Sequence, residues 1–286
     1  MMKKRIKITP AVHKMKARLR GSLLHTVCEE ARCPNMCECF GRGTAAFMIL
    51  GDICTRSCGF CGVKKGRPLP LDPDEPVRVA KMAEDLNLRH AVITSVTRDD
   101  LPDEGANHFA ETIKRIRGKA VIEVLTPDFH AREEFLRAVC NAGPDIFNHN
   151  IETVRRITRM VRPQADFDRS LEVLRLVKKN YPQMTVKSGI MAGLGERKEE
   201  VVETLKELCD AGVEVVTIGQ YFAPSRTNLP VAEQITDETF ERYRELGEAM
   251  GIKKIFSGRF VRSSYMAEDI MKGHRTALQP SGGSHG

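Results

Sequence analysis

Residues 44–61 read TAAFMILGDICTRSCGFC, an apolar run followed at once by three closely spaced cysteines. The first part, TAAFMILGD (44–52), predicts a buried strand, because it is short and almost continuously apolar. Further on, PDEPVRVAKMAEDLNL (73–88) has apolar residues at helical spacing. A strand followed by a helix is the unit that builds parallel sheets with helical crossovers.

This alternation of strand and helix continues along the chain. Five more apolar runs predict strands, and each is followed by a segment with helical spacing. The strands are expected at 90–97, 120–127, 145–152, 184–193 and 214–222, and the helices at 105–118, 131–143, 170–180, 198–212 and 237–251. Six such units predict an α/β fold, an incomplete (β/α)6 barrel of the TIM type. A doubly wound sheet remains an alternative, although no glycine-rich phosphate fingerprint follows any strand.

The predicted barrel divides the chain into three parts. Residues 1–40 form a cysteine-rich N-terminal extension, residues 41–251 the barrel, and residues 252–286 a C-terminal extension that ends in the flexible tail SGGSHG. In barrels of this type the chemistry lies on the loops that follow the strands. The cysteines of CTRSCGFC follow the first strand, so they are expected at that mouth.

Composition limits the classes of protein that this chain can belong to. Of its 286 residues, 41% are hydrophobic and 29% are charged, as in a globular protein. No run of about 18 apolar residues predicts a membrane span, and no apolar segment follows the basic N-terminus to make a secretory signal. We therefore expect a cytoplasmic protein with reduced thiols. The net charge of +7 is dispersed, and aromatic residues make up 6% with no Trp, so neither a nucleic-acid nor a membrane partner is expected.

Seven of the nine cysteines lie between residues 28 and 61. An odd count in a reducing compartment argues against disulfides and favours a metal or cluster site. Cys54, Cys58 and Cys61 have the spacing C-x3-C-x2-C. Three thiolates leave one position open on a 4Fe–4S cluster, where a small molecule can bind. A zinc site completed by His25 or by a further cysteine is the alternative.

A second set of cysteines lies upstream of the first. Cys28, Cys33 and Cys39 form the pattern C-x4-C-x5-C, and variants of the pattern that recruit Cys37 are also available. The spacing alone does not choose between them.

Taken together, the two cysteine sets resemble those of the lipoyl synthases, a family of radical S-adenosylmethionine enzymes. The resemblance covers essentially the whole chain after the first 20 residues. It rests on the sequence CPN (33–35), which begins at Cys33, and on a series of further motifs: RDDLPDEGA (98–106), IEVLTPDF (122–129), FNHNIETV (147–154), VRPQADFDRSL (161–171), KSGIMAGLGE (187–196), TIGQYFAPS (217–225) and VRSSY (261–265).

The resemblance implies two 4Fe–4S clusters, together with S-adenosylmethionine. It implies that Cys54, Cys58 and Cys61 hold the radical-generating cluster, and that Cys28, Cys33 and Cys39 hold an auxiliary cluster. The fourth auxiliary ligand is expected to be Ser264, with Ser263 as the alternative and Arg262 nearby. The family typically has a small residue where this chain has Cys37, which we interpret as a neighbour of the cluster because the C-x4-C-x5-C pattern is complete without it.

The implied reaction inserts two sulfur atoms at C6 and C8 of an octanoyl chain attached to a lysine of a lipoyl carrier protein. These alkyl carbons are too weakly acidic for any side-chain base. A cofactor must therefore do the chemistry, here a 5′-deoxyadenosyl radical from S-adenosylmethionine, with the auxiliary cluster as sulfur donor. Three kinds of partner are expected: octanoylated carriers (acyltransferase subunits of 2-oxoacid dehydrogenases and the glycine-cleavage carrier protein), an electron donor such as ferredoxin or flavodoxin, and an iron–sulfur carrier that rebuilds the cluster.

Polar residues near the expected strand ends are candidates for binding S-adenosylmethionine. They are Thr97, Arg98, Asp99, Glu123, Asn148, Asn150, Lys187 and Ser188. Simpler roles are open for several of them, such as an Asp that caps the next helix. Two functional alternatives also stand beside the main prediction. One is a biotin synthase-like sulfurtransferase, whose auxiliary ligands would lie within the barrel strands, and the other is a zinc-stabilised nucleic-acid-binding protein.

Overall fold

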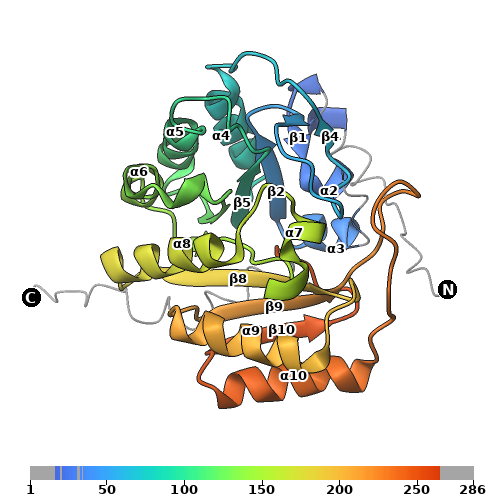
Figure 1. The fold of residues 1–286 in the computed structure, drawn as a ribbon. Helices are drawn as coiled ribbons and strands as arrows, with labels where there is room; N and C mark the ends of the chain where they lie inside the picture. Colours follow the sequence, from blue (N-terminus) through green and yellow to red (C-terminus); the bar gives the residue numbers. More distant parts are fainter. Residues whose placement is uncertain (1–16, 20, 31–32, 34, 265–286) are drawn as a thin grey trace, which may run out of the picture.

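The computed structural model describes residues 17–264 apart from 20, 31, 32 and 34. Within these residues, an eight-stranded sheet forms the centre of the molecule (Figure 1). In their order across the sheet, its strands are β1 (His25–Thr26), β2 (Thr44–Ile49), β5 (His90–Ser95), β6 (Val121–Leu125), β7 (Ile146–Asn148), β8 (Thr185–Ala192), β9 (Val215–Gln220) and β10 (Lys254–Gly258).

The sheet is an open arc and not a closed barrel. From β2 to β10 every pair of neighbouring strands is parallel, and only β1 runs antiparallel to its neighbour β2. The strand order is linear, so β1 and β10 are its two edges. The predicted α/β fold, a partial barrel of the TIM type, is therefore confirmed.

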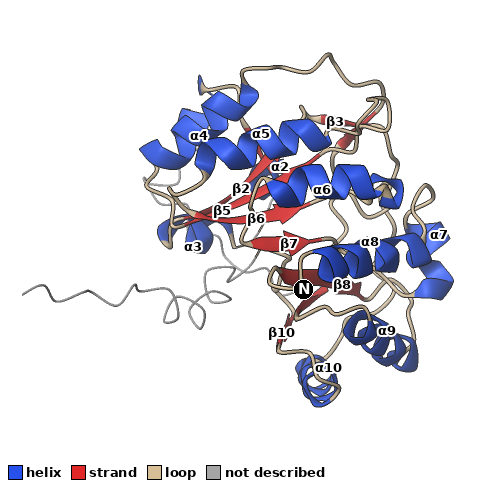
Figure 2. Ribbon diagram, turned by 90° about the vertical axis from the view of Figure 1, so that its left-hand side faces the viewer, coloured by secondary structure: helices blue, strands red, loops and turns tan. Residues whose placement is uncertain are grey.

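Helices cover the outside of this arc (Figure 2). They are α4 (Glu75–Asp85), α5 (Ala106–Ile116), α6 (Glu133–Asn141), α8 (Phe167–Asn180), α9 (Lys198–Asp210) and α10 (Asp237–Ala249). Each matches a predicted helix within a few residues. Every residue of β2 and of β9 is buried, as expected for strands that are covered on both faces.

Shorter elements extend the predicted pattern. The helices α2 (Val27–Glu30) and α3 (Met36–Gly41) lie in the N-terminal extension, and η1 (Phe129–Ala131), η2 (Arg155–Ile157) and α7 (Thr158–Val161) lie in loops. The strands β3 (Ile53–Cys54) and β4 (Lys64–Lys65) pair around the cysteine loop. Strand β10, from the predicted C-terminal extension, joins the sheet beside β9.

Strand β7 is shorter than the strand expected at 145–152. Its ladder ends at Asn148, and beyond it an isolated bridge joins Glu152 to Ile190 of β8. Glu152 has a φ of +68°, a conformation that does not continue a regular strand. Tyr265 and the tail SGGSHG lie outside the described residues. Within the described residues, no helix has the length and apolar character needed to cross a membrane.

Candidate radical and sulfur-donor site

The first cysteine set lies in the loop that follows β2. Cys54 ends β3, and its Sγ accepts hydrogen bonds from the backbone N–H groups of Arg56 (3.4 Å) and Thr97 (3.3 Å). Burial raises the pKa of Cys58, and it raises the pKa of Cys61 to about 11. The charge of Cys54 also raises both pKa values, and the charge of Cys58 raises that of Cys61.

A second loop, which follows β9, holds this cysteine loop in place. Asn228 Nδ2 donates to the carbonyl oxygens of Gly59 (3.1 Å) and Cys61 (3.0 Å), and the Leu229 N–H donates to Gly59 O (3.0 Å). A Cβ atom at Gly59 would lie only 2.8 Å from Leu229 Cγ. Glycine is therefore needed at residue 59 so that Leu229 can pack there.

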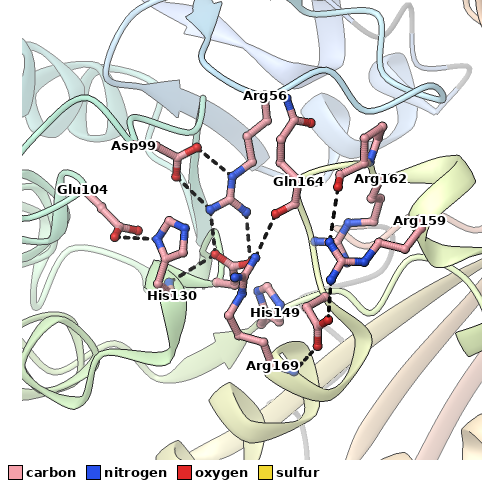
Figure 3. A network of polar contacts seen from close by, with 12 residues as sticks. Arg56, Asp99, Glu104, His130, His149, Arg159, Arg162, Gln164 and Arg169 are labelled. Atoms are coloured by element: carbon pink, nitrogen blue, oxygen red, sulfur yellow. Dashed lines mark hydrogen bonds and ion pairs between the residues drawn. The ribbon is translucent and has the colours of Figure 1, made fainter.

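Arg56 joins the cysteine loop to two other loops at the same end of the sheet (Figure 3). Its guanidinium donates to Asp99 at 2.7 and 2.9 Å and to Asp128 at 2.8 and 3.0 Å. Arg169, on α8, also donates to Asp128 at 2.9 Å. Burial alone would raise the pKa of Asp128, but the hydrogen bonds and charge of Arg56 outweigh burial and hold that pKa well below its usual range. The network is therefore a cluster of two arginines and two aspartates, in which Arg56 and Asp128 are buried and Asp99 lies at the exposed rim.

Glu104 and His130 lie beside this network (Figure 3). Possible ligand atoms of Asp99, Glu104 and His130 lie within 4.8 Å of one another. However, both carboxylate oxygens of Asp99 bind Arg56, and Glu104 Oε1 pairs with His130 Nδ1 at 2.7 Å. These side chains are therefore already engaged with protein partners.

A buried ion pair crosses the interior of the arc. Lys187 Nζ donates to both oxygens of Glu123, at 2.9 and 3.1 Å, and Asn148 Nδ2 donates to Glu123 Oε1 at 3.0 Å. Burial alone would raise the pKa of Glu123, but the charge of Lys187 and the neighbouring His90 lower it to about 2. Three residues expected to bind S-adenosylmethionine thus form one cluster, and Glu123 has the partner that a buried carboxylate requires.

Several buried polar atoms near these residues have no hydrogen-bond partner. They include Asn148 Oδ1, Asn150 Oδ1 and His149 Nε2. His149 Nδ1 lies 2.9 Å from the carbonyl oxygen of Thr126, so Nδ1 carries the proton and Nε2 is an unoccupied acceptor. Buried acceptors of this kind normally find a donor. Their presence beside the cysteine loop fits a site for a polar small molecule.

The other predicted residues at this end of the sheet have defined contacts. Thr97 and Asp99 border the cysteine loop, and Ser188 Oγ accepts from the backbone N–H of Ile151 at 3.1 Å. Arg98 instead pairs with Asp100 at 2.9 Å and donates to the Leu50 carbonyl at 3.3 Å.

The second cysteine set surrounds a cavity between the two chain extensions. Its lining residues are Cys28, Cys33, Asn35, Cys39, Thr44, Ala46, Arg262 and Ser264. Three cysteines from the N-terminal extension therefore meet a serine that is more than 220 residues further along the chain. Neither Cys37 nor Ser263 is among the lining residues.

The donor set of this cavity fits a metal cluster. Burial, together with the charges of Cys33 and Cys39, raises the pKa of Cys28 to about 12. A thiol that resists ionisation in this way becomes a stable thiolate when cations neutralise its charge, and metal binding then releases its proton. Thiolate sulfur with one oxygen donor is a ligand set that an iron–sulfur cluster can accept.

Sequence reasoning missed four side chains that organise these sites. They are Arg56, Asp128, Asn35 and Asn228. Three of them carried a local signal, because Arg56 lies between two of the predicted cysteines, Asn35 within the CPN sequence and Asp128 within IEVLTPDF.

Sequence comparisons relate this chain to known proteins. The profile of the Radical SAM superfamily matches residues 48–208. The lipoyl synthase of Caldanaerobacter subterraneus subsp. tengcongensis is 54% identical over 260 residues, which cover 90% of this chain and 91% of that protein. The lipoyl synthase of Rubrobacter xylanophilus is 52% identical over 271 residues, which cover 94% of this chain and 84% of that protein.

Solved structures support the fold. Methylornithine synthase is 14% identical with a TM-score of 0.52, and the alignment covers 94% of this chain and 93% of that one. Coproporphyrinogen III oxidase from Escherichia coli, described as a radical SAM enzyme, is 13% identical with a TM-score of 0.52, covering 73% and 53%. The close sequence relatives and the matched profile together show that this chain is a radical SAM enzyme of the lipoyl synthase family.

Proposed function

We propose that this enzyme replaces hydrogen by sulfur at C6 and C8 of an octanoyl chain attached to a lysine of a lipoyl carrier protein. The proposal requires two cysteine-lined sites in one chain, one to start the reaction and one to supply sulfur. The cavity lined by Cys28, Cys33, Cys39 and Ser264 is the observation that carries it.

Cys54, Cys58 and Cys61 would hold the first 4Fe–4S cluster. When bound, such a cluster would supply the reducing electron to S-adenosylmethionine, and so the radical chemistry that can remove hydrogen from unactivated carbon. The protein must hold the loop still and keep bulk water from the reacting carbons. The Arg56 network and the Asn228 contacts hold the loop, and Thr97, Asp99, Asn148, Asn150, Lys187 and Ser188 are candidates for contacts with S-adenosylmethionine.

The roles of Glu123 and Arg98 differ from those of the other candidates. Lys187 engages both oxygens of Glu123, and Asp100 engages the guanidinium of Arg98. We propose that Glu123 orients Lys187, and that Arg98 shapes the loop after β5.

The auxiliary cluster would be a substrate held by Cys28, Cys33, Cys39 and Ser264. A serine oxygen is a harder ligand than a thiolate and binds iron less durably. This weaker bond suits a cluster that must open to give up its sulfur, and Ser264 is preferred over Ser263 because it lines the cavity. After each turnover an iron–sulfur carrier would rebuild the cluster.

Metal analysis tests the two-cluster requirement. Anaerobically reconstituted protein should contain about eight irons per chain, and a Cys28→Ala, Cys33→Ala, Cys39→Ala variant about four. The wild type should convert an octanoylated carrier to its lipoylated form, whereas the variant should cleave S-adenosylmethionine without forming a carbon–sulfur bond. Equal iron contents of about four, or zinc in both samples, would rule the proposal out.

A further inference from the structure

The serine that lines the auxiliary cavity belongs to a segment that leaves β10 and crosses β9. We name residues 258–264 the crossing segment. On the β9 side this segment packs tightly, because a Cβ atom at Gly219 would collide with the Val261 carbonyl oxygen. The rings of Phe222 and Phe260 stack with their centroids 6.2 Å apart. The end of β9 therefore fixes one side of the crossing segment.

Asn35 fixes the opposite side. This asparagine is 1% exposed, and its Nδ2 donates to the Phe260 carbonyl oxygen at 2.6 Å. The Asn35 backbone belongs to the cysteine turn, because its carbonyl oxygen accepts from the Cys39 N–H at 3.0 Å and the Met36 N–H donates to Cys33 O at 3.3 Å. One residue thus contacts both the turn that carries the cysteines and the segment that carries the serine.

We infer that Asn35 is a positioning residue that holds Ser264 in register with Cys28, Cys33 and Cys39. The inference rests on the proposed function, in which these four residues bind the auxiliary cluster. An oxygen ligand binds iron less durably than a thiolate. How long the Ser264 oxygen stays bound to iron therefore depends on how firmly the crossing segment is held. The Asn35 side-chain amide holds the segment through its hydrogen bond to the Phe260 carbonyl oxygen, and it does not itself bind iron.

A chelator experiment on the anaerobic holoenzyme tests this role. Asn35→Ala should speed iron loss from the auxiliary site by about three- to tenfold, the effect expected when one buried hydrogen bond is lost. The EPR signal that responds to added S-adenosylmethionine reports the first cluster, and it should be unchanged. Ser264→Ala should also speed auxiliary iron loss, and adding Asn35→Ala to it should have no further effect, because both changes act through the same ligand.

Two further variants keep the test selective. Ser264→Cys supplies a stronger ligand, so it should restore slow iron loss to the Asn35→Ala chain. Asn228→Ala is the matched control: it removes the same kind of amide from the cysteine loop of the first cluster, so it should affect the first cluster and spare the auxiliary one.

Gly219→Ala displaces the crossing segment from the β9 side without touching the cysteine turn. It should also speed iron loss from the auxiliary site alone, and it replaces Asn35→Ala in the test if that variant does not fold.

Three results would overturn the inference: additive effects of Asn35→Ala and Ser264→Ala on iron loss, equal weakening of both clusters, or unchanged auxiliary iron loss in Gly219→Ala. A wild-type chain that binds only about four irons would instead contradict the proposed function itself. If the wild type binds about eight irons, and Ser264→Ala speeds auxiliary iron loss but Asn35→Ala does not, only the inference about Asn35 is contradicted.

Discussion

Single residues set the geometry of both sites through contacts over long distances in sequence. Arg56 pairs with Asp99 and Asp128, which lie 43 and 72 residues away. The sequence predicted Asp99 as a site residue but not the pair with Arg56, because contacts between loops leave no local periodicity. Ser264, which was expected from a family motif, lines the cavity together with the three cysteines.

The Arg56–Asp128 pair should contribute strongly to stability. Asp128→Asn removes one partner of a buried ion pair, and it leaves Arg56 with a buried charge that is only partly compensated. We expect a loss of about 3–5 kcal/mol in the free energy of unfolding, measured by anaerobic urea denaturation.

Asp168→Asn is the matched control for this substitution. Asp168 pairs with Arg155 on the surface, where its side chain is 72% exposed. Such pairs contribute about 0–1 kcal/mol. Similar destabilisation by the two substitutions would contradict a structural role for the buried network.

His149 should make stability depend on pH. Burial, with a further contribution from the positive charge of Arg162, lowers the pKa of His149 from its ordinary value of 6.5 to about 4. Between these values the unfolded chain binds a proton that the folded chain does not, so this contribution is fully present above pH 6.5 and is lost as the pH falls towards 4. Unfolding measured between pH 7.5 and 5 should therefore show a shallower pH dependence for His149→Gln than for the wild type. Equal slopes would show that another group is responsible.

At the level of elements, the sequence predicted the six strand–helix units well because each has a long hydrophobic pattern. It missed β1, β3 and β4, which have two residues each, and β10, which has five. Such short strands show little periodicity: β1 and β10 form on the free edges of β2 and β9, and β3 and β4 pair with each other. Asn228 and Leu229, in the loop after β9, were also missed as part of the site, although they contact the first cysteine loop.

Gly59→Ala tests the contact between these two loops. The added methyl group would lie 2.8 Å from Leu229 Cγ, so the loops must separate. Overpacking of this kind costs about 1–3 kcal/mol, and iron retention by the first cluster should fall. Leu229→Ala in the same chain should restore part of that retention, because it makes room for the methyl group.

Gly21→Ala serves as the control for Gly59→Ala. A Cβ atom at Gly21 meets nothing within 4 Å, so this substitution should leave iron retention unchanged. A normal first cluster in Gly59→Ala would contradict the proposed contact.

At the scale of the whole molecule, the open arc brings together parts of the chain that are distant in sequence. The loops after β2 and β9 meet at the first cysteine set, while the N-terminal turn and the crossing segment meet at the auxiliary cavity. The partial barrel was predictable from the repeated units. The way in which the two extensions meet was not predictable, because their contacts form only once the sheet is complete.

The central claim is that the auxiliary site supplies the sulfur of the product. Its most direct test is a single turnover of an octanoylated carrier by protein whose clusters were reconstituted with heavy-isotope sulfide, in buffer that contains only light sulfide. Mass spectrometry should find two heavy sulfur atoms in each lipoyl group, and no sulfur should be inserted by the Cys28→Ala, Cys33→Ala, Cys39→Ala variant. A product that contains light sulfur, or sulfur insertion by that variant, would contradict the claim.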